Sequence, residues 1–319
     1  MRINAPIKKI NGLELWYNCC WVITMNKDAC SICPRACLAK RVETSGKGLC
    51  GMGLSPVVAK AMLHHWEEPC ISFTKGSGAV FFSGCALNCV YCQNREISID
   101  RFGKPVSAAR LREIYYELIG QGAHNINLVN PTHFARCILD SLEDGLSVPV
   151  IWNSGGYDSA ETLRQFEGKV QIYLPDMKYA LSAPAARYSG AADYPDAAKC
   201  AISEMFRQTG PYHMGDDGLL ISGVVIRHLI LPKNLENTFR VIDWAAQTFS
   251  PGDVLFSLMS QYTPCGKLDE APELQRQLSN EEYDAAIRYL EASGIEDGFF
   301  QELSSAKEEY IPDFDLSGI

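Results

Sequence analysis

Three cysteines lie close together in the stretch FFSGCALNCVYCQN at residues 81–94. Cys85, Cys89 and Cys92 have the spacing C-x3-C-x2-C. Thiolates bind iron–sulfur clusters strongly, and a 4Fe–4S cluster normally takes four of them. Three thiolates would hold three irons and leave the fourth iron open to a chelating ligand. A three-cysteine zinc site is the alternative interpretation of this spacing.

A second cysteine group precedes the first. Cys30, Cys33, Cys37 and Cys50 follow the pattern C-x2-C-x3-C-x12-C. Four thiolates with a glycine-rich return loop fit a closed tetrahedral zinc site that would stabilise a lobe with little core of its own. The same ligands could hold a second, auxiliary 4Fe–4S cluster for electron relay, or remain free thiols. Ligand softness does not separate zinc from an iron–sulfur cluster here.

The composition is that of an ordinary globular protein. The chain has 319 residues, 47% hydrophobic residues and a net charge of −9. An acidic balance argues against a nucleic-acid partner. No apolar run is long enough to cross a membrane, and the N-terminus lacks a secretory signal, so we expect a cytoplasmic protein. We also expect a monomer. Thirteen cysteines in a reducing compartment indicate metal or iron–sulfur binding rather than disulfides.

Strands and helices alternate from Ala79 onward. The expected strands are mainly continuous apolar runs, which is typical of a parallel sheet covered on both faces. The pattern predicts an α/β fold, a partial (βα)6 barrel of the TIM type, with a doubly wound open sheet as the competing architecture. Strands are expected at 79–82, 126–130, 148–153, 170–176, 223–232 and 253–259, and helices at 106–122, 133–145, 158–168 with an Asp cap, 196–210, 234–247 and 279–294.

Three segments are expected along the chain. Residues 1–75 form an N-terminal cysteine-rich metal-binding lobe and connector, residues 76–295 the barrel, and residues 296–319 a C-terminal extension. In either α/β architecture the site should lie at the carboxyl ends of the strands. The unusual sequences at those ends are the cysteine loop, NPTH, NSGG and PDMK.

The segment CALNCVYC resembles the CxxxCx(aromatic)C signature of the radical S-adenosylmethionine (SAM) superfamily. The resemblance implies that Cys85, Cys89 and Cys92 ligate a 4Fe–4S cluster whose open iron chelates SAM, and that Tyr91 packs near the adenine. A longer similarity is to proteins like pyruvate formate-lyase activating enzyme. It runs from CSICPRAC through GSGAVFFSGCALNCVYCQNREIS, INLVNPTH and IRHLILP to IPDFD, with Asn94 after the cluster loop.

The same resemblance implies that SAM is held by polar groups at the strand ends. The superfamily's second strand usually ends in a Gly-Gly-Glu-Pro-like stretch, which is replaced here by NPTH, and PDMK resembles the family's Asp-x-Lys. Arg227 and His228 are adjacent on one strand, so only one faces the interior; we expect it to be Arg227, with His228 satisfied in the core. The expected SAM contacts are Tyr91, Asn94, Asn130, Thr132, Asn153, Ser154, Asp176, Lys178, Arg227 and Gln261.

The activity implied by the resemblance is reductive cleavage of SAM to a 5′-deoxyadenosyl radical that abstracts hydrogen. The expected partners are a low-potential electron donor of the flavodoxin or ferredoxin type and a glycyl radical enzyme as substrate. A small-molecule or peptide substrate is the alternative within the superfamily. A non-catalytic iron–sulfur electron-transfer protein is the alternative from another class.

Overall fold

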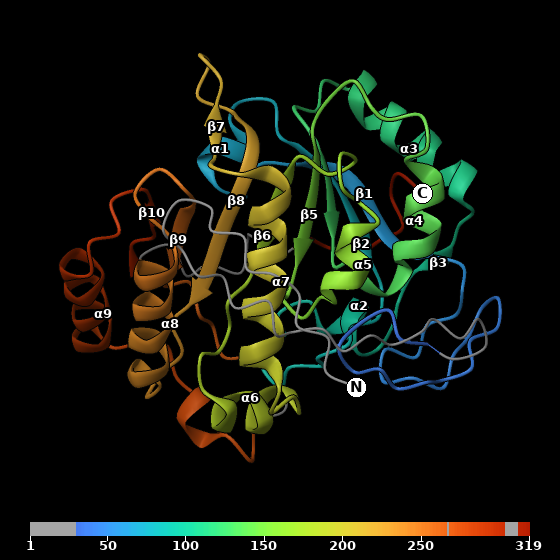
Figure 1. Cartoon of the computed structure of the whole chain (residues 1–319). Coiled ribbons are helices and arrows are strands. Elements are labelled where there is room, and N and C mark those ends of the chain that lie inside the picture. The colour runs from blue at the N-terminus through green and yellow to red at the C-terminus, as the bar shows by residue number, and fades with distance from the viewer. Residues whose placement is uncertain (1–29, 267, 304–311) are drawn as a thin grey trace, which may run out of the picture.

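A curved sheet forms the centre of the molecule (Figure 1). The computed structural model describes residues 30–266, 268–303 and 312–319. In this part of the chain the sheet has ten strands, and its main path runs β10-β9-β8-β6-β5-β4-β2-β1-β3. The strands that run parallel to one another are β2 (Ser77–Phe82), β4 (Ile126–Val129), β5 (Val150–Ser154), β6 (Ile172–Pro175), β8 (Leu220–Leu229), β9 (Leu255–Met259) and β10 (Gly298–Phe300).

Antiparallel strands complete the sheet. β1 (Val57–His64) pairs with β2, β3 (Lys104–Pro105) pairs with β1, and β7 (His213–Met214) pairs with β8. The sequence analysis did not predict β1, which lies within residues 1–75, or β10, which lies within residues 296–319. β1 has eight residues, but buried and exposed positions do not alternate along it, and β10 has only three residues, too few to give a recognisable period.

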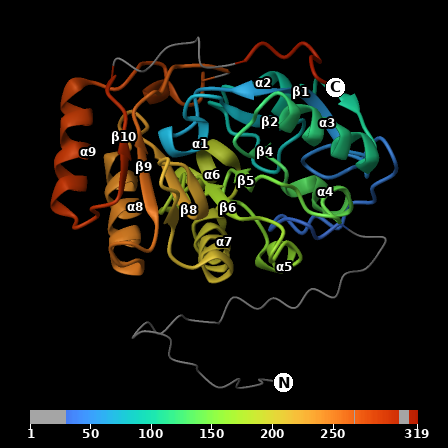
Figure 2. The same cartoon turned by 90° about the horizontal axis from the view of Figure 1, so that it is seen from above.

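Helices cover the outer face of the sheet. Seen from above, α3, α4, α5, α7, α8 and α9 form an arc around the strands, and α1 lies inside it (Figure 2). The bounds are α1 (Pro69–Ser72), α2 (Arg95–Ser98), α3 (Ala108–Gly120), η1 (Thr132–Phe134), α4 (Ala135–Ser141), α5 (Ala160–Arg164), α6 (Ser182–Ser189), α7 (Tyr194–Thr209), α8 (Leu235–Thr248), η2 (Pro272–Leu274) and α9 (Asn280–Ala292).

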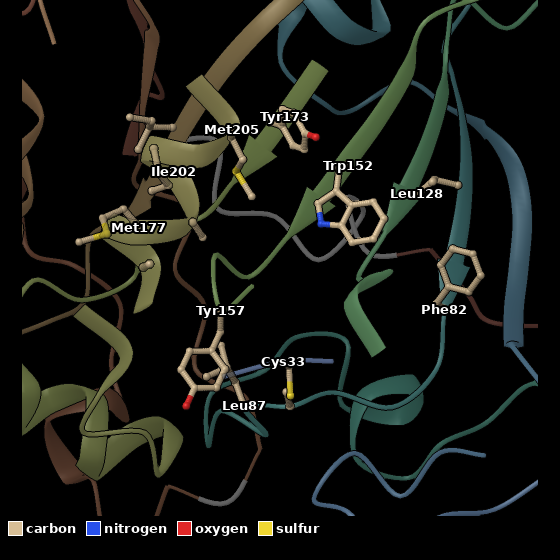
Figure 3. Packing of buried hydrophobic residues seen from close by; sticks show 14 of the residues in the cluster. Cys33, Phe82, Leu87, Leu128, Trp152, Tyr157, Tyr173, Met177, Ile202 and Met205 are labelled. Atoms are coloured by element: carbon tan, nitrogen blue, oxygen red, sulfur yellow. The ribbon is translucent and has the colours of Figure 1, made fainter. Parts of the chain in front are cut away.

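Alternation along the strands gives the sheet two different faces. On the outer face, Trp152 and Tyr173 pack with helix residues such as Ile202 and Met205 in the largest hydrophobic cluster (Figure 3). The inner face carries a smaller apolar group that includes Ile151 and the neighbouring strands' inward residues. Farther along the strands the inner face becomes polar, and this polar region is part of the candidate site.

The predicted α/β partial barrel is confirmed, and the sheet is not closed. Each expected strand overlaps an observed strand, and each expected helix overlaps an observed helix. The expected helix at 158–168 is shorter, because α5 covers only Ala160–Arg164. The predicted Asp cap is wrong: the N-cap residue is Ser159, and the Asp158 carboxylate accepts hydrogen bonds from side chains of other elements.

The last described residues lie along β1. The amide of Leu316 donates to Ala59 O (3.1 Å), and the amide of Ala61 donates to Ser317 O (3.0 Å). The Phe314 ring meets Phe81 of β2 edge to face, with 5.6 Å between centroids. The far end of the chain therefore supports the strand that leads into the three-cysteine loop.

Candidate functional site

The three-cysteine loop leaves the carboxyl end of β2 and turns back into α2. Gly84 has φ +82° and Asn88 has φ +52°, so both lie in the left-handed region. A side chain at position 84 would collide with Met52, which explains why glycine opens the loop. The amide of Val90 donates to Tyr188 O (2.9 Å), which pins the loop to the end of α6.

Each thiol of the loop has a hydrogen-bonding neighbour. The Ser189 hydroxyl donates to Cys89 Sγ (2.9 Å), the amide of Leu87 donates to Cys85 Sγ (3.3 Å), and Cys92 Sγ lies 3.2 Å from the Ser98 hydroxyl. Donors aimed at sulfur stabilise cluster-bound thiolates. The donor set therefore fits a 4Fe–4S cluster held by three protein thiolates.

Burial governs the acid–base behaviour of these thiols. It raises the pKa of Cys89 to about 12, with smaller contributions from the Lys178 ammonium, which lowers this pKa, and from the other two thiols, which raise it. Burial also raises the pKa of Cys92. A free thiolate here is costly, so iron binding has to displace the protons.

A group of buried tyrosines closes one side of the loop. Tyr91 Oη lies 2.7 Å from Tyr179 Oη, which lies 2.8 Å from the Ser189 hydroxyl that contacts Cys89. Tyr91 also meets the rings of Tyr188 and Tyr262 edge to face. These aromatic side chains shield the cysteine sulfurs from water on this side.

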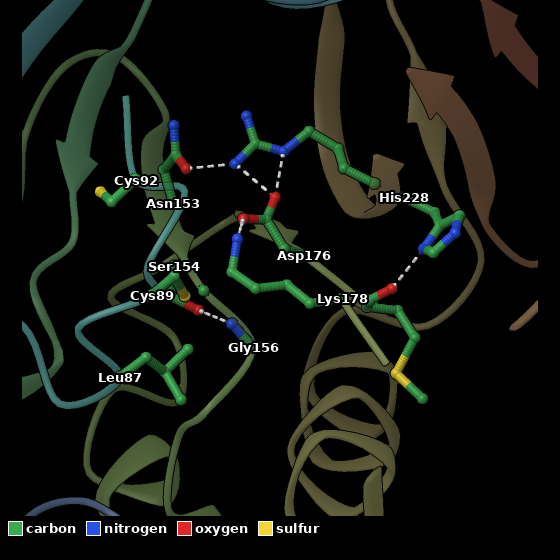
Figure 4. Close-up of polar contacts among 12 residues, drawn as sticks. Leu87, Cys89, Cys92, Asn153, Ser154, Gly156, Asp176, Lys178 and His228 are labelled. Atoms are coloured by element: carbon green, nitrogen blue, oxygen red, sulfur yellow. Dashed lines mark hydrogen bonds and ion pairs between the residues drawn. The ribbon is translucent and has the colours of Figure 1, made fainter. Parts of the chain in front are cut away.

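Polar side chains from three strand ends meet on the inner face (Figure 4). Lys178 Nζ donates to Asp176 Oδ2 (2.6 Å), Arg227 Nε donates to Asp176 Oδ1 (3.0 Å), and Arg227 Nη2 donates to Asn153 Oδ1 (2.6 Å). The structure thus brings together four of the predicted SAM-binding residues. Lys178 is also near enough to the thiols of Cys89 and Cys92 to interact with them electrostatically.

Glu67 extends this polar group from the opposite end of the sheet. It precedes α1 and reaches into the interior, where its carboxylate accepts from Arg227 Nη1 (3.1 Å), Asn153 Nδ2 (3.0 Å) and Asn127 Nδ2 (3.1 Å). Its neighbour Glu68 is buried, and its Oε2 atom has no hydrogen-bond partner. Sequence analysis missed both glutamates because the segment between β1 and β2 carries no motif that marks it as part of a site.

The charges of this inner group stabilise one another. Burial alone would raise the pKa of Asp176, but Arg227 and Lys178 outweigh it and hold that pKa below its usual value. Burial would lower the pKa of Lys178, but Asp176 and the Cys89 thiol raise it overall. Burial raises the pKa of Glu68. Asp176, Lys178 and Arg227 therefore stay charged at neutral pH.

Residues 75–174 match the family model described as a 4Fe-4S single cluster domain. This range contains the three-cysteine loop, β2, β4 and β5, and it ends within β6. The match confirms the predicted iron–sulfur domain around the three-cysteine loop. We call residues 75–174 the iron–sulfur domain.

Similarity to other proteins extends beyond this domain. The uncharacterized protein MJ0674 of Methanocaldococcus jannaschii is 29% identical over 279 residues, which cover 84% of this chain and 75% of the relative. The crystal structure of Streptococcus suis SuiB bound to S-adenosylmethionine matches with 13% identity and a TM-score of 0.46, over 71% of this chain and 50% of SuiB. Methylornithine synthase (PylB) matches with 12% identity and a TM-score of 0.44, over 68% of each chain. This chain thus spans about half the length of SuiB.

Other residues predicted to contact SAM lie apart from the inner polar group. The Thr132 hydroxyl donates to Asp158 Oδ1 (2.6 Å), and the Ser154 hydroxyl donates to Asp158 Oδ2. Trp152 Nε1 donates to the same carboxylate (3.1 Å). Asp158 is thus a buried acceptor for three donors on the outer face, and the structure separates Thr132 and Ser154 from Asn153.

The remaining predicted residues lie in four different places. Asn130 has φ +60°, and its side-chain amide donates to Gly84 O, so it braces the cluster loop. Asn94 is the N-cap residue of α2 and makes no side-chain capping bond. Gln261 is half-buried beyond β9. His228 faces outward, with Nδ1 2.7 Å from Met177 O and Nε2 3.0 Å from the Thr238 hydroxyl on α8.

The N-terminal thiols lie beside the iron–sulfur domain. Cys30, Cys33, Cys37 and Cys50 are near one another: burial raises the pKa of Cys33 to about 12, and the other three thiols raise it further. By ligand type alone, four thiols suit zinc or an iron–sulfur cluster. In the described residues, no three cysteine, histidine or acidic side chains are gathered around the position of a single metal ion. None of the helices described has the length and apolar character that crossing a bilayer requires.

Proposed function

We propose that this chain is a radical SAM enzyme that cleaves SAM reductively and directs the product radical to a C–H bond. The observation that carries the proposal is the position of the three-thiol loop beside the inner polar group at the strand ends. When bound, a 4Fe–4S cluster with one iron open to SAM supplies the electron that breaks a sulfonium carbon–sulfur bond, which generates a 5′-deoxyadenosyl radical.

The residues of the chain have separate roles in this proposal. Lys178 offers an ammonium group to the carboxylate of SAM, and Asp176 keeps that ammonium charged and oriented. Asn153 and Arg227 fix Asp176 from the far side, so they position the pair. Tyr91 and Tyr179 exclude water from the thiols, which protects a radical from quenching.

The substrate we propose is a glycine residue of a glycyl radical enzyme. The support is the sequence resemblance to pyruvate formate-lyase activating enzyme, which runs from CSICPRAC to IPDFD. The electron donor would be a low-potential protein of the flavodoxin or ferredoxin type. A sheet that does not close leaves room for a polypeptide segment to approach from the side.

The test is anaerobic reconstitution with iron and sulfide, followed by dithionite, SAM and an assay for 5′-deoxyadenosine. We expect product from the wild type and none from Cys89→Ser. Cys137→Ser, a partly buried cysteine outside both thiol groups, is the matched control and should behave like the wild type. An intact, reduced cluster that yields no 5′-deoxyadenosine would reject SAM cleavage in favour of an electron-transfer protein.

A second step tests the substrate. The active enzyme is incubated with a candidate glycyl radical enzyme and observed by electron paramagnetic resonance for a glycyl doublet. 5′-Deoxyadenosine without a doublet, but with a modified peptide or small molecule, would replace the proposed substrate while leaving the SAM chemistry in place.

A further inference from the structure

Arg35 joins the two cysteine groups. It lies between Cys33 and Cys37 in the sequence CPRAC. Its guanidinium donates three hydrogen bonds to backbone carbonyls of the cluster loop and of the end of α6: Nε to Ala86 O (2.9 Å), Nη2 to Ser189 O (2.8 Å) and Nη1 to Gly190 O. Its charge also lies over the Tyr157 ring, 5.4 Å from the centroid. A planar fork of donors suits such a cluster of acceptors better than a single ammonium does.

The carbonyls that Arg35 holds flank one cluster ligand. Ala86 lies in the loop between Cys85 and Cys89. Ser189 is the residue whose hydroxyl donates to Cys89 Sγ (2.9 Å). The guanidinium therefore fixes the loop on one side of Cys89 and the hydrogen-bond donor to its sulfur on the other. It also brings a positive charge to the loop that carries Cys85 and Cys89.

The N-terminal thiol group touches the cluster loop a second time. Its return loop meets Gly84, where an added side chain would collide with Met52 and come within 3.0 Å of Cys50 O. Arg41 donates to Met52 O (3.1 Å) and His133 O (2.7 Å), and His133 Nε2 lies 2.7 Å from Ser83 O, one residue before Gly84.

The N-terminal segment has little apolar core to hold these contacts in place. Between residues 30 and 55, the buried hydrophobic residues are Ile32, Cys33 and Met52. Cys33 packs near Leu87 of the cluster loop and Tyr157 (Figure 3). A metal bound by the four thiols would order this segment and with it Arg35. Because linkage is reciprocal, ordering Arg35 would in turn steady the cluster loop.

We propose that Arg35 is a positioning residue that couples a thiophilic metal centre at the four N-terminal cysteines to the cluster loop at Cys85–Cys92. The centre clamps the loop through the Ala86 and Ser189 carbonyls, so its occupancy controls how firmly the cluster is held. This inference requires a cluster at the loop but not SAM cleavage, so it goes beyond the proposed function.

The main experiment compares Arg35→Ala and Arg35→Lys with the wild type, all reconstituted anaerobically. EDTA is added, and the loss of cluster absorbance is followed. We expect Arg35→Ala to lose iron about tenfold faster, because a charge-assisted hydrogen bond to the loop is gone. Its midpoint potential should be lower, since a cation beside the cluster favours the reduced, more negative state. Arg35→Lys should restore the potential but only part of the retention, since lysine lacks the fork.

The matched control is Arg112→Ala. Arg112 also donates to two backbone carbonyls, Ser141 O (3.2 Å) and Asp140 O (3.1 Å), but it lies on α3 and contacts α4 rather than the loop. Its iron loss and potential should equal those of the wild type. If Arg35→Ala equals the wild type in both readouts, or if Arg112→Ala changes them equally, the assignment of Arg35 is overturned.

The metal itself is tested with Cys37→Ser, which replaces an exposed thiol. Zinc and iron are counted in the wild type and the variant. A loss of about one zinc identifies a zinc centre, and a loss of about four irons identifies an auxiliary cluster; either, with faster EDTA stripping of the remaining cluster, supports the coupling. Unchanged metal content, or metal loss with normal cluster retention, contradicts it. Failure of the proposed function would instead appear as absent 5′-deoxyadenosine in a wild type that retains its iron normally.

Discussion

The two faces of the sheet handle buried polar groups in different ways, and the neighbours Arg227 and His228 show the difference within one strand. His228 faces the helices, where a carbonyl of the β6–α6 loop and a hydroxyl of α8 satisfy its two nitrogens. Arg227 faces inward, where it binds two carboxylates and an amide from three other segments.

The difference concerns how many elements depend on one side chain. On the outer face, His228 and Asp158 each contact two other segments, and the partners there are uncharged. The inner polar group links four segments into one charged network: the loop after β1, β5, the end of β6, and β8. This network ends at Lys178, beside the thiols of the three-cysteine loop. We infer that the outer face is built for stability and the inner face for holding charge in place.

Replacing Arg227 should give the largest effect. In Arg227→Met, the Asp176 and Glu67 carboxylates remain buried without their shared cation, so the free energy of unfolding should fall by about 4 kcal/mol. Anaerobic urea unfolding followed by tryptophan fluorescence measures this, and calorimetry should show weakened SAM binding. Arg240→Met is the control, since its ion pairs on α8 are long (4.0 and 3.9 Å) and exposed. Equal losses in the two variants would contradict the importance of the inner network.

An intermediate effect is expected on the outer face. Asp158→Ala removes the acceptor shared by Thr132, Ser154 and Trp152. The hydroxyls of Thr132 and Ser154 can reorient toward other acceptors, but the indole N–H of Trp152 cannot. The free energy of unfolding should therefore fall by about 2–3 kcal/mol. SAM affinity should change much less than in Arg227→Met. A loss of SAM affinity as large as that of Arg227→Met would show that the outer face also belongs to the binding site.

The smallest effect is a change in pH dependence. Burial lowers the pKa of His228 to about 4, below its unfolded value near 6.5. The unfolded state therefore takes up a proton first, so this histidine's contribution to stability is complete above about pH 7 and decreases as the pH falls towards 4. From pH 7.5 to pH 5, protonation of this histidine in the unfolded state should lower the free energy of unfolding by about 2 kcal/mol. The variant His228→Gln should lack this part of the pH dependence.

The control for this measurement is His213→Gln, which alters an exposed histidine on β7. Stability curves of this variant and the wild type should run parallel from pH 5 to 7.5. If the stability curve of His228→Gln is also parallel to that of the wild type, burial does not lower the pKa of His228 as expected.

The sequence predicted the parts that local patterns specify. The apolar runs of the parallel strands and the spacing of Cys85, Cys89 and Cys92 carry their own signals, and strand alternation alone separates Arg227 from His228. Alternation could likewise have separated Asn153 from Ser154. Glu67 and Arg35 could not be found in this way, because their importance comes from contacts with residues far away in the sequence, such as Asn153 and Ala86.

The contact between Phe314 and Phe81 has a consequence for biogenesis. The ring that supports β2, just ahead of the cluster loop, comes from a segment more than two hundred residues later in the chain. During synthesis that support is missing until residue 314 has left the ribosome. A maturation machinery that delivers iron and sulfide would therefore meet a finished binding loop only late in translation or afterwards.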